Sequence, residues 1–247
     1  METMAATSRS SESGKAGGVT VLVPARNEAE SLPEVLAALE DTRPDYRVLV
    51  VDNGSTDATA GVAREAGARV VAEPRPGYGR ACQAGIAAEA RRQHPPGVLA
   101  FLDADDRRGP AELPRVVEPV RRGSADLVLG RRRREDGVPP HAAAGNALVS
   151  AVLRGLYGWA GRDMGPLRAI RFRSLLALGL DDPDFGWNVQ MHVRALRAGL
   201  TVREVPVRFE PRQRGESKIS GVPSAVVRAG ATMIGTLARE AIRPRWR

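Results

Sequence analysis

A run of five apolar residues that stops at three carboxylates limits the possible folds of this chain more than any other stretch. Residues 98–102 read Val-Leu-Ala-Phe-Leu, and Asp103, Asp105 and Asp106 follow. Such a run is typical of a strand buried on both faces of a parallel sheet, where ligands bind at the carboxyl ends of the strands. Crowded carboxylates there repel one another unless a cation or hydrogen bonds hold them. The pattern suits Mg²⁺ or Mn²⁺ carrying a phosphate, with a plain strand-to-helix turn as the alternative.

Shorter apolar runs before this stretch predict the rest of the sheet. Runs at 19–23, 48–51 and 70–71 alternate with helical patterns. The order strand, helix, strand predicts parallel strands joined by right-handed crossovers. We therefore expect an α/β fold with a Rossmann-like, mostly parallel central sheet and helices on both faces. Ser31 and Glu34 form a candidate capping box for the first helix. After residue 148 the strict alternation is lost, and we expect that half to form the acceptor side of a site.

Composition excludes several classes of protein. The single cysteine, Cys82, cannot form an internal disulfide or a Cys-based zinc site, and it fits a reducing cytoplasm. The net charge of +8 fits nucleic acid, a membrane surface or a phosphate-rich substrate, but nearly all basic residues are arginine, a compositional bias that weakens any argument from charge. Aromatic residues are few and are not interleaved with the basic runs, which argues against nucleic acid as a partner. No apolar run reaches the length of a bilayer span, so we expect no transmembrane helix.

The two ends of the chain differ from its middle. We expect residues 1–18 to be a disordered tail, 19–221 to be the folded domain, and 222–247 to be an amphipathic basic helix. The helix either lies on a membrane surface or packs on the sheet, and these alternatives are about equal. On a membrane, Val226, Met233, Ile234 and Leu237 would meet the acyl boundary, and Arg239, Arg243, Arg245 and Arg247 would meet anionic head groups.

Three polar segments are candidate phosphate sites. The glycines around Tyr78 do not fit a dinucleotide fingerprint, because Cys82 stands where the third glycine is required. Beside Arg80 they either admit a diphosphate or form a plain loop. The arginines at 131–134 are a solvated surface, which we favour, or a phosphate clamp. Lys218 is the only lysine outside the N-terminal tail, which suggests that its loop needs a compact ammonium group.

The motifs taken together resemble the family 2 glycosyltransferases, which have a GT-A fold. The resemblance covers about residues 19–230 and rests on Pro-Ala-Arg-Asn-Glu at 24–28, Val-Asp-Asn-Gly-Ser-Thr-Asp at 51–57, Gly-Tyr-Gly at 77–79, Asp-Ala-Asp at 103–105 and Arg-Gln-Arg-Gly-Glu-Ser-Lys at 212–218. More narrowly, Asp-Met-Gly-Pro-Leu-Arg-Ala-Ile at 163–170 and Glu-Val-Pro at 204–206 resemble the polyprenyl-phosphate (dolichol-phosphate) sugar synthases.

The resemblance implies a role for each matching position. Ala25, Glu28 and Asp52 would contact the base and ribose of the nucleotide. Asp103 and Asp105 would hold Mg²⁺ or Mn²⁺ and the donor diphosphate. The residues with implied catalytic roles are Asp105, Asp163, Arg212 and Lys218. The implied substrate-binding set is Pro24, Ala25, Arg26, Glu28, Asp52, Gly77, Arg80, Asp103, Ala104, Arg131, Arg168, Trp187, Gln190, Arg214 and Ser217.

The resemblance implies a metal-dependent, inverting hexosyltransferase that uses a UDP- or GDP-sugar. The acceptor would be a polyprenyl phosphate, met by a cytoplasmic protein that contacts the inner membrane face peripherally. A soluble enzyme acting on a small hydroxyl acceptor is the alternative. Gln190 departs from the pattern, because relatives carry a glutamate there. A missing carboxylate fits a phosphate acceptor, which is already ionised near neutral pH, whereas a hydroxyl acceptor would need a base such as Asp163 or Asp184.

Overall fold

The structure of the protein is a computed structural model. It describes residues 17–43, 45–132, 140–159, 161, 163, 165–209 and 223–242, without the side chains of 140–148 and 223–231. Residues 1–16 of the predicted tail and the predicted boundary at residue 221 fall outside the described residues.

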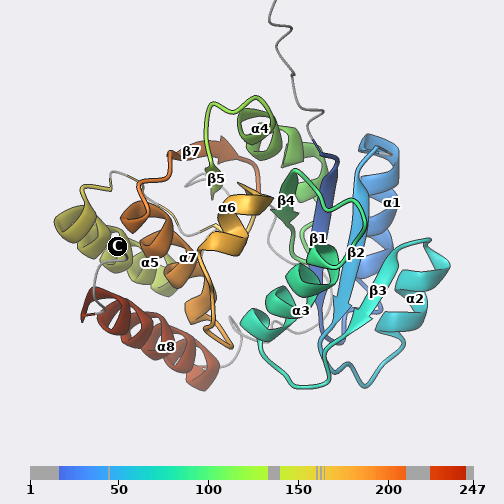
Figure 1. Ribbon diagram of the computed structural model, residues 1–247. Helices are drawn as coiled ribbons and strands as arrows, with labels where there is room; N and C mark the ends of the chain where they lie inside the picture. The colour runs from blue at the N-terminus through green and yellow to red at the C-terminus, as the bar shows by residue number, and fades with distance from the viewer. Residues whose placement is uncertain are drawn as a thin grey trace, which may run out of the picture.

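Seven strands and eight helices make up the described part of the chain (Figure 1). The strands are β1 (Val19–Ala25), β2 (Arg47–Asp52), β3 (Arg69–Ala72), β4 (Val98–Phe101), β5 (Leu127–Arg132), β6 (Arg168–Arg171) and β7 (Val202–Val207). The helices are α1 (Leu32–Thr42), α2 (Thr59–Glu65), α3 (Tyr78–Ala90), α4 (Gly109–Arg121), α5 (Pro140–Tyr157), α6 (Phe172–Ala177), α7 (Gly186–Arg197) and α8 (Pro223–Ile242).

The strands form one sheet in the order β3-β2-β1-β4-β6-β5-β7. All neighbouring pairs are parallel except those of β6, which runs antiparallel to both β4 and β5. The expected mostly parallel sheet is confirmed. Because β6 runs against its neighbours, its first residue lies at the same edge of the sheet as the carboxyl ends of the other strands.

Each face of the sheet carries its own hydrophobic layer. Alternate residues of a strand point to opposite faces, so Val21 and Val23 face α1, α2 and α4, whereas Leu22 faces α3, α6 and α7. The same division holds in β4, where Ala100 lies in the first layer and Phe101 in the second. Strands buried on both faces account for the continuous apolar runs in the sequence.

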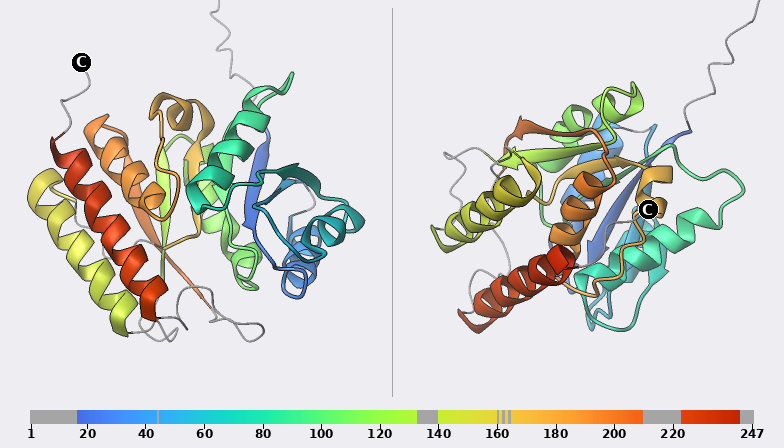
Figure 2. Two further views of the ribbon diagram at one scale, coloured as in Figure 1. Left: turned by 90° about the horizontal axis from the view of Figure 1, so that it is seen from below. Right: turned by 60° about the vertical axis from the view of Figure 1, so that its left-hand side comes forward.

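A third layer lies outside α7. Helices α5 and α8 lie side by side at the end of the molecule away from α2, and both contact α7 (Figures 1 and 2). Leu237 is 6% exposed and packs with Met233, Val149, Leu153 and residues of α7. The expectation that Met233 and Leu237 meet a membrane is therefore wrong, because this side of α8 is part of the core. Ile234, by contrast, is 51% exposed.

The start of α1 differs from the predicted capping box. The Ser31 hydroxyl donates to Oε2 of Glu28 at 2.6 Å, and its oxygen accepts no capping hydrogen bond from a backbone N–H of the helix. Glu34 instead pairs with Arg107 at 2.5 Å. The helix is stabilised by its apolar side, and Leu32, Val35, Leu36 and Leu39 are all buried as expected. Within the described ranges, no helix has the length and apolarity needed to cross a bilayer.

We predict that the buried His192 contributes to acid sensitivity. Burial, followed by the charge of Arg168, lowers the pKa of His192 from 6.5 to about 3. The unfolded chain therefore binds a proton that the folded protein does not, and stability is lost as the pH falls from 6.5 toward 3. His192→Leu should show a smaller drop in melting temperature between pH 7 and pH 5 than the unaltered protein. Equal drops in both proteins would contradict this assignment.

Candidate active site

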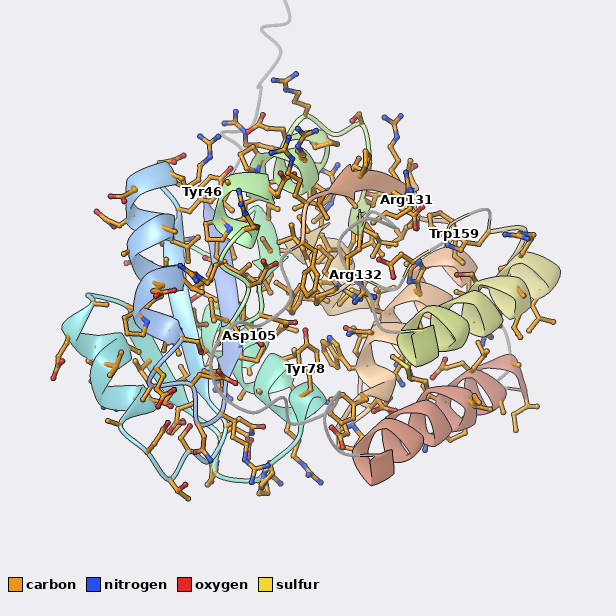
Figure 3. All side chains as sticks on the ribbon, turned by 180° about the vertical axis from the view of Figure 1, so that it is seen from behind. Tyr46, Tyr78, Asp105, Arg131, Arg132 and Trp159 are labelled. Atoms are coloured by element: carbon orange, nitrogen blue, oxygen red, sulfur yellow. The ribbon has the colours of Figure 1, made fainter. Side chains whose placement is uncertain are left out.

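One edge of the sheet gathers most of the residues predicted to bind a ligand. Ala25 and Asp52 end β1 and β2 and pair in register. Asp103 follows β4, Arg131 lies near the end of β5, and Arg168 begins β6 between them. Figure 3 shows Asp105, Tyr78 and Arg132 in the middle of the molecule, between the sheet and the helices α5 and α8. Open parallel sheets bind their ligands at such an edge.

Asp103 lies in a cluster of opposite charges. Burial, followed by the carboxylates of Asp105 and Asp106, raises the pKa of Asp103 to about 7, although Arg168 and Arg132 oppose the rise. Arg168 is completely buried, and its guanidinium donates to the carbonyl oxygens of Gly165 at 2.5 Å and Pro166 at 3.2 Å. A cation brought to Asp103 and Asp105 would relieve the repulsion between the carboxylates.

The three aspartates after β4 do not share one task. Asp106 is buried and accepts the backbone N–H groups of Gly109 at 2.9 Å and Arg108 at 3.2 Å, so it caps α4. Asp103 and Asp105 are half-buried, and Ala104 between them is buried. The backbone N–H of Asp106 also donates to the carbonyl of Asp103 at 3.1 Å, so the predicted turn is present, and the carboxylates of Asp103 and Asp105 remain candidate metal ligands.

Two carboxylates suit a metal ion that also binds a phosphate. In the described part of the chain, no cluster of three or more His, Cys, Asp or Glu residues could hold a metal ion. Mg²⁺ and Mn²⁺ accept one or two protein carboxylates when phosphate oxygens complete the coordination. Asp103 and Asp105 fit this arrangement.

The loops after β1 and β2 are bonded to each other. The Asn27 side chain accepts the N–H of Thr56 at 2.7 Å, and the backbone N–H of Glu28 donates to Oγ1 of Thr59 at 2.8 Å. Asn27 has a φ of 51°, a left-handed conformation that asparagine tolerates better than most residues. Asp52 accepts the N–H of Ser55 at 3.2 Å. Asp52 therefore stabilises the turn after β2 while it lies at the edge of the sheet.

The other predicted residues of the first loop lie at different depths. Pro24 is half-buried, Ala25 is buried and Arg26 is exposed. Glu28 is half-buried and accepts the Ser31 hydroxyl. The loop therefore presents backbone and polar side chains near Asp52, where the base and ribose were predicted to bind.

Asn53 fixes the glycine-rich loop to the end of β2. Its amide nitrogen donates to the carbonyl oxygens of Arg75 at 2.8 Å and Glu73 at 3.2 Å. Its oxygen accepts the N–H of Gly77 at 2.8 Å. Sequence reasoning missed this residue because an asparagine before a glycine reads as an ordinary turn.

The glycines of this loop are required by packing. A Cβ atom on Gly77 would collide with the carbonyl of Pro183, and one on Gly79 would collide with the carbonyl of Asp182. Gly77 also has a φ of 144°, which disfavours other residues. Arg80 is half-buried and donates to the carbonyl of Pro76 at 2.7 Å. Close approach of another loop explains why these positions are glycine.

Tyr78, between the two glycines, points toward the charged cluster. Burial raises the pKa of Tyr78, with further contributions from Cys82 and Asp103, while Arg168 opposes the rise. The phenol therefore lies within electrostatic range of Asp103 and Arg168. Sequence reasoning quoted Tyr78 within the Gly-Tyr-Gly motif but did not predict it as a site residue.

The arginines after β5 are paired with acidic side chains. Arg132 donates to both carboxylate oxygens of Asp163, from Nε at 3.0 Å and from Nη2 at 2.8 Å. Glu204 accepts the backbone N–H of Asp163 at 2.9 Å and lies 3.4 Å from Nε of Arg131. A solvated surface, the favoured expectation, is wrong for Arg132, whose side chain is only 16% exposed.

Trp187 and Gln190 lie on α7 and are both buried. Trp187 packs in the layer that contains Phe101 and Tyr78. The Gln190 oxygen accepts the N–H groups of Asp181 at 2.8 Å and Asp182 at 3.0 Å, and its nitrogen donates to Asp181 at 2.7 Å and Glu240 at 3.0 Å. These bonds use all the donors and acceptors of the Gln190 amide. We therefore correct the prediction that Gln190 binds substrate, because its side chain binds the 181–184 loop instead.

Four predicted residues of the arginine-rich loop fall outside the described residues. They are Arg212, Arg214, Ser217 and Lys218.

A second hollow lies at the opposite edge of the sheet. This groove of about 500 Å³ is lined by residues that include Pro95, Pro96, Arg171 and Leu176. It opens at the amino ends of β1 and β4, where open parallel sheets do not bind their ligands. The carboxyl edge remains the candidate active site.

Comparison with known proteins shows the family of the chain. Residues 20–175 match the model of glycosyl transferase family 2. An uncharacterized glycosyltransferase of Mycobacterium tuberculosis is 44% identical over 82% of this chain and 90% of its own length. The undecaprenyl-phosphate mannosyltransferase of Micrococcus luteus is 36% identical over 92% of this chain and 98% of its own length. The polyprenol monophosphomannose synthase of Mycolicibacterium smegmatis is 32% identical over 81% of this chain and 80% of its own length.

Solved structures show the same fold. Glucosyl-3-phosphoglycerate synthase from Mycobacterium tuberculosis, in complex with Mn²⁺, uridine diphosphate and phosphoglyceric acid, has a TM-score of 0.74 at 22% identity, covering 92% of this chain and 80% of that one. The same enzyme has been crystallised with Mg²⁺ and uridine diphosphate. The GT-A fold expected from the sequence is confirmed.

The fold and the sheet-edge site define a nucleotide-sugar-dependent glycosyltransferase. The chain belongs to glycosyl transferase family 2, and it resembles the polyprenyl-phosphate sugar synthases of that family, as its sequence predicted.

We predict that Asn53→Ala weakens both the fold and donor binding. It removes three hydrogen bonds and leaves two carbonyls and one N–H of the 73–77 loop unpaired, which should cost about 1–3 kcal/mol in urea unfolding. Titration with a nucleoside diphosphate should show lower affinity. The exposed neighbour Thr56→Ala is the control and should change stability by less than about 0.5 kcal/mol. Equal behaviour of the two variants would contradict the role of Asn53.

Proposed function

We propose that this enzyme transfers a hexose from a UDP- or GDP-sugar to a polyprenyl phosphate, with inversion at the anomeric carbon and with Mg²⁺ or Mn²⁺ bound at Asp103 and Asp105. The relatives named for undecaprenyl phosphate and polyprenol monophosphomannose support the acceptor, and the first of them matches nearly its full length. The neighbouring structures that contain Mn²⁺ or Mg²⁺ with uridine diphosphate support the metal.

The pairing of Asp163 with Arg132 is the observation that carries the proposed acceptor. Both carboxylate oxygens of Asp163 accept hydrogen bonds from this arginine, and Glu204 is bonded to Arg131 and to the Asp163 backbone. A carboxylate held in this way is a poor general base. Gln190, where relatives carry an acid, cannot serve as one either. The site therefore favours an acceptor that arrives already ionised.

A phosphate monoester meets that requirement. Its second pKa is about 6, so an oxygen carries full negative charge near neutral pH. That oxygen forms a bond to the anomeric carbon while the bond from the anomeric carbon to the donor diphosphate breaks. The electron pair leaves with the nucleoside diphosphate, and no proton has to be removed. Attack from the face opposite the leaving group inverts the anomeric centre.

The described residues divide this work between two sides. Asp52 and the backbone around Ala25 would hold the base and ribose, and Tyr78 would lie beside the diphosphate. A bound divalent ion would neutralise negative charge on the departing diphosphate. Arg168 and Asp163 would border the sugar. Arg212, Arg214, Ser217 and Lys218 remain proposed phosphate ligands on the acceptor side.

We predict that transfer needs both the metal and a phosphate acceptor. Labelled UDP- and GDP-sugars are supplied with Mn²⁺ and either undecaprenyl phosphate or water-soluble alcohols. We expect transfer of the labelled sugar to the lipid phosphate, and EDTA should abolish this transfer. Asp105→Asn should lower the rate of transfer at least about 100-fold, because it removes one negative charge from the metal site. Asp41→Asn, at an exposed position near the end of α1, serves as the control for replacing a carboxylate by an amide. Transfer to an alcohol but not to the lipid phosphate would replace this function with the small-molecule alternative.

We also propose that the outer side of α5 and α8 contacts the anionic membrane surface where the acceptor lies. Leu156, Ile234 and Ile242 are 56%, 51% and 84% exposed. The only acidic residue in the sequence of either helix is Glu240, which is buried, whereas Arg154 is exposed. An apolar surface with basic and without acidic side chains suits anionic lipid head groups.

We predict that vesicles of anionic phospholipid sediment the protein at low salt and release it at high salt. Ile234→Ser combined with Ile242→Ser should weaken sedimentation, because both side chains lie on the proposed contact surface. Leu176→Ser is the matched control, since Leu176 is 46% exposed on α6. If Leu176→Ser also lost binding, or if the unaltered protein did not bind the vesicles, the proposed contact surface would be wrong.

A further inference from the structure

The start of α3 rests on a loop from the other half of the chain. The backbone N–H of Arg80 donates to the carbonyl of Pro183 at 3.0 Å, and Gln83 donates to the carbonyl of Asp182 at 3.0 Å. Gly77 and Gly79 lie against the same two carbonyls too closely for any side chain. The 181–184 loop therefore sets the position of the segment that carries Tyr78.

The opposite side of this loop is held by α8. The buried carboxylate of Asp182 accepts the Thr236 hydroxyl at 2.7 Å and the Arg239 guanidinium at 2.9 Å. Thr236 is completely buried, so its hydroxyl has been brought into the interior to reach Asp182. A buried hydroxyl is favourable only when it is hydrogen-bonded.

A buried ion pair fixes α8 to α7 beside the same loop. The side chains of Arg194 and Glu240 are 2% and 1% exposed and lie 2.9 Å apart. Arg194 also pairs with Asp181 at 2.9 Å and donates to the carbonyl of Leu178 at 3.1 Å. Buried ion pairs often stabilise a fold no more than apolar residues would, but they select one geometry. Here the geometry selected is that of α7, α8 and the loop between α6 and α7.

We propose that α8 is a positioning element for the donor side of the active site. Thr236, Arg239 and Glu240 act as positioning residues through the 181–184 loop, which in turn sets Gly77, Tyr78 and Arg80. None of the three need touch the donor. The part of this inference that concerns donor affinity rests on the proposed function. The contacts that link α8 to Arg80 do not, because they are hydrogen bonds within the protein.

Thr236→Val tests the proposal, because it removes the hydroxyl and keeps the shape of the side chain. Hydrogen exchange should become faster at the amide of Arg80, more than 150 residues away in sequence but linked through Pro183. The dissociation constant for UDP or GDP with Mn²⁺ should rise about fivefold, the lower end of the coupling found between linked sites. Thr236→Ser keeps the hydroxyl and should restore both values.

Two controls separate positioning from general loss of stability. Ala241→Ser lies on the exposed side of α8 and should change neither value. Val120→Ala weakens the core at the end of α4, far along the chain from the loop, and should lower the melting temperature without changing exchange at Arg80 under native conditions. Unchanged exchange at Arg80 in Thr236→Val, or the same change in Val120→Ala, would overturn the proposal. If the unaltered protein binds neither nucleotide, the proposed function fails while the exchange experiment still decides the positioning role.

Discussion

The positive charge of the buried Arg168 determines how the residues at the carboxyl edge of the sheet are arranged. An arginine without exposure to water is costly unless carbonyls and carboxylates surround it. Here the carbonyls of Gly165 and Pro166 accept its hydrogen bonds, and Asp103 and Asp163 supply negative charge. The antiparallel β6 makes this possible, because it places its first residue between the ends of β4 and β5. One buried cation thus links the donor carboxylates to the acceptor side.

The two sides of the site are ordered by different forces. On the donor side, short polar bonds between loops dominate, such as those of Asn27 and Asn53, and strands buried on both faces fix the loop origins. On the proposed acceptor side, ion pairs dominate, with Arg132 on Asp163 and Arg131 on Glu204.

Membership of glycosyl transferase family 2 fits this division. The strands β1 to β4 and the carboxylates that follow β4 make up the half that we propose binds the nucleotide. The helices α5, α7 and α8 add a layer whose inner side joins the core and whose outer side exposes isoleucine and leucine. An apolar outer surface is costly in water, and contact with a lipid acceptor's membrane would remove that cost.

The sequence by itself determined the parallel sheet and the place of the carboxylates. The continuous apolar runs of β1, β2 and β4 require strands that are buried on both faces. The polar residues that follow each run then meet at one edge of the sheet. The motif order also identified the family. These features are local in sequence, so periodicity and spacing reveal them.

Only the tertiary structure decided which polar groups are already paired. Asp106 caps a helix while Asp103 does not, Arg132 holds Asp163, and Gln190 is bonded to a loop, although the three aspartates look alike in sequence and Asp163 and Gln190 were predicted to act on substrate. The amphipathic pattern of α8 likewise could not tell which apolar residues face the core, and Leu237 faces inward while Ile242 faces outward. Hydrogen bonds and ion pairs join residues tens of positions apart, and spacing along a single sequence does not specify such partners. The three-dimensional arrangement of the strands and helices does.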